Sequence, residues 1–162
     1  MSRFGSPATV VSRASLLGVV AGMRSQMPFA LLAVAARGGG TAADGAGPAG
    51  FLRSDRALVG FGLAAVGELV GDKLPFTPSR LDPLPLAGRV VVGGAAGAVV
   101  ARQAGGPAIR GAAAGAAGSL LGAFGGSRAR AAAGRATGVP DPVWGAVEDV
   151  LALAIGLLAV RR

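Results

Sequence analysis

Apolar residues along the chain fall into five blocks, separated by glycine-rich or proline-rich polar links. A helix needs about 20 apolar residues to cross a bilayer. On this measure the blocks predict transmembrane segments over residues 14–36, 57–71, 86–101, 108–126 and 143–160. The second and third blocks are short for a full crossing, so four spans with a re-entrant element remain an alternative. We therefore expect an all-α integral membrane bundle that forms one domain over residues 1–162.

The first block is interrupted near its centre by polar and helix-breaking residues. Arg24 lies inside the apolar run, and Pro28 follows one turn later. A proline inside a helix has no N–H to donate and frees the carbonyl four residues earlier, which here is that of Arg24. A polar break at membrane depth is tolerated only where protein or a cavity covers it. The pattern thus predicts a first helix broken at Arg24 to Pro28.

The same block also has features of a secretory signal peptide. Arg3 and Arg13 precede the apolar run, and the sequence AVA at residues 33–35 resembles a cleavage site. However, the apolar core of a signal peptide does not normally contain a charge such as Arg24. We therefore favour retention of this segment.

The composition is unlike that of a soluble domain. Hydrophobic residues make up 52% of the chain and charged residues 15%, against roughly 25% charged residues in soluble domains. Glycines at four-residue spacing allow close approach of helices in a bilayer, and the longest such run is Gly118, Gly122 and Gly126. We expect this run to pack within the chain, with a homo-oligomer seam as the alternative. The lipid bilayer is the main expected partner.

The segments GVVAGMRS and GAAAGAAGS, in the first and fourth blocks, are faintly similar. In a five-span arrangement these two blocks would run in opposite directions, as in the inverted repeats of transporters. The same arrangement places eight basic residues on one side of the membrane and seven on the other. This near balance sets no orientation under the positive-inside rule.

Several classes of chemistry are not expected. The chain has no Cys and no His, which excludes disulfides, thiolate chemistry and His-ligated metals. Its net charge of +8 is scattered between apolar blocks, so nucleic acid is not an expected partner. We expect no cofactor and no metal, and no catalytic constellation of an enzyme. The excess of Arg over Lys is typical of a GC-rich bacterial genome, so the expected location is the bacterial inner membrane, in a multi-pass topology.

Ionisable residues within membrane segments usually face the bundle interior, pair with each other or line a polar pathway. The candidate polar centre consists of Arg24, Ser25, Glu68, Glu148 and Asp149. A second cluster is expected in the proline-rich loop and at the membrane edge, formed by Asp72, Lys73, Arg80, Asp82 and Arg89. We expect this loop to be ordered, with Asp72 or Asp82 contacting one of the cluster's cations.

Three stretches carry a resemblance to a known family. They are AGMRSQMPFALLAVAAR, GELVGDKLPFTPSRLDPLPLAGRVVVGGAAGAV and PDPVWGAVEDVLALAIGLLAV. The chain resembles a family of small bacterial integral membrane proteins known as domain of unknown function 4126. The resemblance implies a membrane protein and supplies no activity. The positions that match the family's characteristic residues are Arg24, Ser25, Glu68, Asp72, Lys73, Pro75, Pro78, Arg80, Arg89, Glu148 and Asp149. Other residues depart from its pattern around Arg128 and Arg130, so no fixed role is carried over to these two.

Two functions fit this pattern. In the first, the protein is a small channel or transporter-like protein, and Arg24 with its carboxylates lines a path for an ion or polar solute. In the second, it is a non-transporting scaffold or accessory protein, and the same charges form structural salt bridges.

Overall fold

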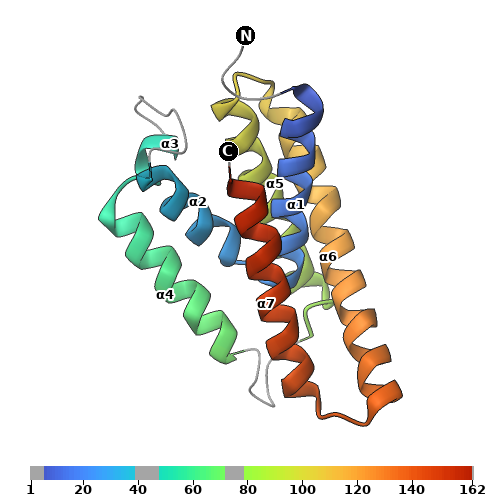
Figure 1. Ribbon diagram of the computed structural model, residues 1–162. Helices are drawn as coiled ribbons and strands as arrows, with labels where there is room; N and C mark the ends of the chain where they lie inside the picture. Colours follow the sequence, from blue (N-terminus) through green and yellow to red (C-terminus); the bar gives the residue numbers. More distant parts are fainter. Residues whose placement is uncertain (1–5, 39–47, 72–78, 162) are drawn as a thin grey trace.

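The computed structural model describes residues 6–38, 48–71 and 79–161, and every regular element in these ranges is a helix. The all-α class is therefore confirmed (Figure 1). In chain order the helices are α1 (Pro7–Met23), α2 (Met27–Arg37), α3 (Pro48–Phe51), α4 (Asp55–Gly71), α5 (Pro83–Gln103), α6 (Ala108–Thr137) and α7 (Asp141–Val160).

Helices α1, α5 and α6 form a closely packed three-helix core, which α7 joins on the α1 side (Figure 1). Glycines make this packing possible because a side chain would not fit. A Cβ on Gly18 of α1 would overlap the backbone of Gly115, and a Cβ on Gly97 of α5 would overlap the backbone of Gly111. Of the run Gly118, Gly122 and Gly126 on α6, the first two lie against the backbone of α1, so packing within the chain occupies these two positions.

The glycine contacts also fix the directions of the core helices. Gly18 meets Gly115 and Gly22 meets Ser119, so α1 and α6 run parallel. The expectation that the first and fourth blocks run in opposite directions is therefore wrong. The reason is that α2 folds back on α1, which adds one reversal that a five-span count omits.

The fold-back occurs at residues 24–26, between α1 and α2. Arg24 is extended, with φ −141° and ψ 106°, and α2 then begins at Met27. Leu31 and Met27 belong to one apolar cluster with Val20, while Leu32 and Ala36 pack in another with Leu17. As α2 advances it thus retraces α1 toward the end where α1 begins.

The break lies where the sequence predicts it, but Pro28 acts differently. It occupies the first turn of α2, where the missing N–H would have no intrahelical partner in any case. Pro28 therefore starts a new helix and does not kink a continuous one.

Helix α4 lies at the edge of the molecule and packs mainly on α2 (Figure 1). Phe29 of α2 stacks on Phe61 of α4, with ring centroids 5.1 Å apart. Ala57 is the buried residue of α4, and four of its large apolar side chains are exposed: Val59, Leu63, Val66 and Val70. We call α2 and α4 together the outer layer.

The helix bounds extend the predicted segments. α6 continues eleven residues past the predicted end at Gly126, through an alanine-rich stretch, and stops at Gly138 with φ 67°. Among the described helices, α5 and α7 are long and apolar enough to cross a membrane, and α1 and α2 are shorter apolar helices. By length and composition, two of the described helices are candidate spans, whereas the sequence predicts five spans.

A candidate polar site at the helix break

Arg24 is the largest fully buried side chain among the described residues, with 1% of its surface exposed. It leaves the end of α1 and reaches α7, where its Nε donates to Oδ1 of Asp149 at 2.5 Å. Its Nη1 donates to the carbonyl oxygen of Met23 at 2.7 Å, and its Nη2 lies 3.6 Å from Oε2 of Glu148. The guanidinium therefore binds both a carboxylate and a carbonyl that the break removes from the helix ladder.

Glu68, near the end of α4, accepts hydrogen bonds from the backbone amides that follow Arg24 at the break. Its Oε1 accepts from the backbone N–H of Ser25 at 2.7 Å and from the Ser25 hydroxyl at 2.9 Å. Its Oε2 accepts from the N–H of Gln26 at 2.9 Å. No side chain of α2 itself caps this helix start. A carboxylate is well placed here because the helix N-terminus carries partial positive charge.

Arg89 of α5 connects the core to Glu68. Its Nη2 lies 3.2 Å from Oε1 of Glu68, and its Nη1 donates to the carbonyl oxygen of Gly22 at 3.2 Å. Arg89 is 7% exposed. One guanidinium therefore joins the end of α1, the outer layer and the first part of α5.

Glu148 of α7 forms ion pairs with three guanidinium groups. Arg80 forms a bidentate pair with it, through Nη1 to Oε1 and Nη2 to Oε2. Arg130 Nη1 lies 3.4 Å from Oε2, and Arg24 approaches the same oxygen. Glu148 is 6% exposed, so these cations replace the water that a carboxylate would otherwise bind.

Arg130 and Asp141 extend the site and were not among the predicted site residues. They form a bidentate pair at the edge of the site, and the hydrogen bond to Asp141 raises the pKa of Arg130 above its usual value. A signal for Arg130 does exist in the sequence. It continues the four-residue spacing of Gly118, Gly122 and Gly126, which places it on the same face of α6.

Small residues make space for the charged groups. A Cβ on Gly126 would collide with Oε1 of Glu148, and one on Gly145 would lie 3.4 Å from the guanidinium carbon of Arg130. Gly126, the last glycine of the predicted run, therefore faces this site.

The structure divides the predicted loop cluster. Arg80 and Arg89 belong to the polar site and contact Glu148 and Glu68, whereas Asp82 is exposed at the start of α5. Asp72 and Lys73 lie outside the described residues, as does the proline-rich loop up to residue 78, and the predicted order of this loop therefore stays a prediction.

The described part of the site balances four guanidinium groups against four carboxylates. The pairs are Arg24 with Asp149, Arg80 with Glu148, Arg89 with Glu68, and Arg130 with Asp141. Such a cluster can hold helices together, and it can also exchange one charged group for another. Within the described residues no group of three or more His, Cys, Asp or Glu could hold a metal ion.

Comparison with known proteins identifies a family but no individual relative. No curated protein and no solved structure matches the chain. Residues 12–161 match the family described as "Domain of unknown function (DUF4126)". The match covers nearly the whole chain, including every residue of the polar site, and the protein therefore belongs to this family.

Proposed function

We propose that the protein is a polytopic membrane protein that passes a small ion or polar solute between its three-helix core and its outer layer. The membrane part of this proposal is supported by α5 and α7, which are long and apolar enough to span. It is also supported by the apolar side chains that α4 and α7 leave exposed, among them Leu63 at 69% and Val150 at 66%. Apolar surface on this scale suits lipid contact better than water.

The transport proposal rests on the position of the charged groups within the fold. The core helices contact one another through glycines and alanines, whereas the charged groups gather at the break where the core meets the outer layer. Transporters commonly place polar sites at broken helices, and they work by moving one helix group against another.

Glu68 is the residue that the proposed motion would release. It connects the C-terminal end of α4 to Ser25, Gln26 and Arg89. The rest of α4 packs mainly on α2. Moving this end of α4 away would leave four guanidinium groups against three carboxylates. The excess positive charge favours a small anion, or a solute with an anionic group, as the species that enters.

Flux into proteoliposomes tests this proposal. Glu68→Gln keeps the size of the side chain but removes its ion pair with Arg89, so we expect faster entry of small anions. The matched control is Asp55→Asn, an equivalent change in the same helix at an exposed pair with Arg37, and it should leave flux at the wild-type level. If folded wild-type protein and folded Glu68→Gln pass no anion, cation or neutral polar solute from a broad set, the transport proposal is wrong.

The scaffold function has its own supporting observation. Arg24, Arg89 and Glu68 together bind the carbonyls and amides that the break leaves without helical partners. A purely structural cluster would need these contacts and no others. In that case Glu68→Gln would lower the stability of the fold without any change in flux.

A further inference from the structure

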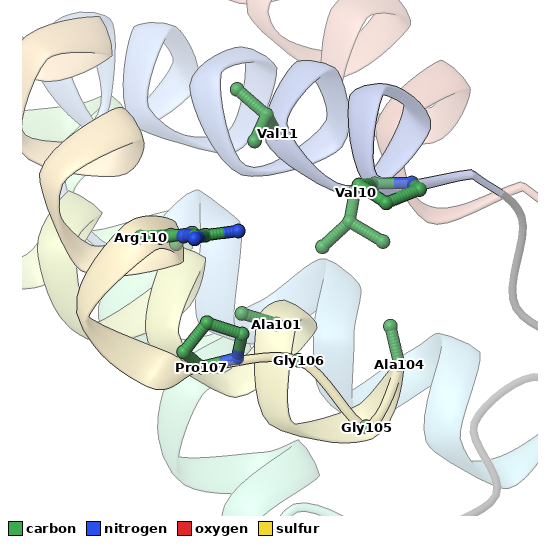
Figure 2. Close-up of a pocket in the computed structure, with 10 residues that line it drawn as sticks. Val10, Val11, Ala101, Ala104, Gly105, Gly106, Pro107 and Arg110 are labelled. Carbon is green, nitrogen blue, oxygen red and sulfur yellow. The ribbon is translucent and has the colours of Figure 1, made fainter.

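A pocket of about 250 Å³ lies at the end of the bundle opposite the polar site. Figure 2 shows that α1 contributes Val10 and Val11, while the end of α5 and the link to α6 form the other wall. The lining is apolar or glycine backbone except for Arg110, whose guanidinium points into the space.

We propose that this pocket binds the headgroup region of an anionic glycerophospholipid, with Arg110 contacting the phosphate. The proposal rests on membrane residence but not on transport. A volume of about 250 Å³ is below the roughly 300 Å³ at which small-molecule pockets begin. The pocket therefore suits part of a lipid whose acyl chains remain in the bilayer.

The position of the pocket fits a headgroup. It lies where α5, a candidate span, ends at Gln103 and where α6 begins at Ala108. The first-turn amides of α6 add partial positive charge there, and no side chain caps this helix start. A phosphate at the membrane surface would therefore meet a guanidinium and a helix N-terminus together.

Charge complementarity distinguishes this end from the other. Among the described residues it carries seven arginines and one carboxylate, Asp55, which pairs with Arg37. Arg13 binds the carbonyl oxygen of Ala159 at 2.7 Å. No carboxylate of the described residues pairs with Arg110, so its charge is available to an anionic lipid. Basic pockets between helices at a membrane surface are typical sites for such headgroups.

Native mass spectrometry of the detergent-purified protein tests the proposal, with phosphatidylglycerol and phosphatidylcholine of identical chains as probes. We expect wild-type protein to retain phosphatidylglycerol preferentially. Arg110→Gln should weaken this binding about tenfold, the usual effect of losing one charge-assisted hydrogen bond. Arg102→Gln is the matched control, because it removes a charge from the same end without lining the pocket, and it should keep wild-type binding.

A second variant tests the pocket itself. Ala104→Leu places a larger apolar side chain in the lining at unchanged charge, so we expect it also to reduce binding of phosphatidylglycerol. Equal binding by wild type, Arg110→Gln and Ala104→Leu would overturn the proposal, as would an equal loss in Arg110→Gln and Arg102→Gln. Displacement of the lipid by inorganic phosphate at equal concentration would also overturn it, because the site would then recognise free phosphate.

Discussion

Arg24 shows how an apolar helix can end in a buried permanent cation. An arginine cannot lose its proton in a protein, so a buried one needs acceptors in several directions. Here Asp149 supplies a carboxylate oxygen at 2.5 Å and Met23 a carbonyl oxygen at 2.7 Å. The break that exposes the carbonyl is thus also the feature that makes the charge tolerable.

This arrangement predicts a large effect of removing Arg24. Taking away one partner of a buried pair leaves an uncompensated charge and destabilises by about 3–5 kcal/mol. Arg24→Gln should therefore lower the unfolding free energy in detergent strongly, and Arg24→Gln combined with Asp149→Asn should recover part of the loss. The control Arg128→Gln removes an exposed cation that lies over Phe124 at 5.6 Å, and it should change stability by roughly 1 kcal/mol or less. A double variant no more stable than Arg24→Gln alone would contradict the proposed pairing.

The types of residue at the polar site were predictable, but their pairing was not. Arg24, Glu68, Glu148 and Asp149 each stand out as a charge within an apolar block. Which carboxylate meets which arginine depends on the rotation of α7 and on the fold-back of α2, and neither is encoded by local periodicity. Arg80 was assigned to the loop for the same reason, because only tertiary contacts bring it to Glu148.

At the scale of the helices, glycine position decides packing. A Cβ on Gly115 of α6 would collide with the carbonyl of Gly93, whereas a Cβ on Gly125 of the same helix would meet nothing within 4 Å. Gly115→Ala should therefore destabilise by about 1–3 kcal/mol, the usual effect of overpacking. Gly125→Ala should be neutral or stabilise by up to roughly 1 kcal/mol, since alanine favours a helix. Thermal unfolding in detergent compares the two variants, and equal melting temperatures would contradict the glycine-mediated contact between α5 and α6.

The existence of the helices follows from the sequence more closely than their directions. Four of the predicted blocks, over residues 57–71, 86–101, 108–126 and 143–160, lie within α4, α5, α6 and α7. The first block became two helices because Pro28 occupies a first turn, a role that sequence alone does not separate from a kink. The length of α6 was underestimated because the stretch after Gly126 is polar enough to resemble a loop yet rich in alanine.

At the scale of the molecule, the fold-back of α2 redistributes the basic residues between the two ends. Helices α1, α4 and α6 all begin at the end of the bundle where α7 ends (Figure 1). Among the described residues this end carries seven arginines: Arg13, Arg37, Arg53, Arg56, Arg102, Arg110 and Arg161. The opposite end carries six described arginines, of which Arg24 and Arg89 are buried and paired in the polar site, and four are not buried: Arg80, Arg128, Arg130 and Arg135. Among the described arginines that are not buried, the near balance expected from five spans therefore becomes a bias of seven to four.

This bias predicts the orientation of the protein in the membrane. Basic residues flanking membrane spans are retained on the cytoplasmic side, so we expect the arginine-rich end to face the cytoplasm. Because the chain has no cysteine, single replacements can report sidedness in intact cells with a membrane-impermeant maleimide. Ala136→Cys, near the end of α6, should be labelled from outside, whereas Ser6→Cys, just before α1, should react only after the cells are opened.

Carbonate washing should leave both variants in the membrane pellet, and release of the protein would contradict membrane residence itself. Equal labelling of the two positions from outside would mean that the molecule inserts in both directions, and the arginine bias would then not set its orientation.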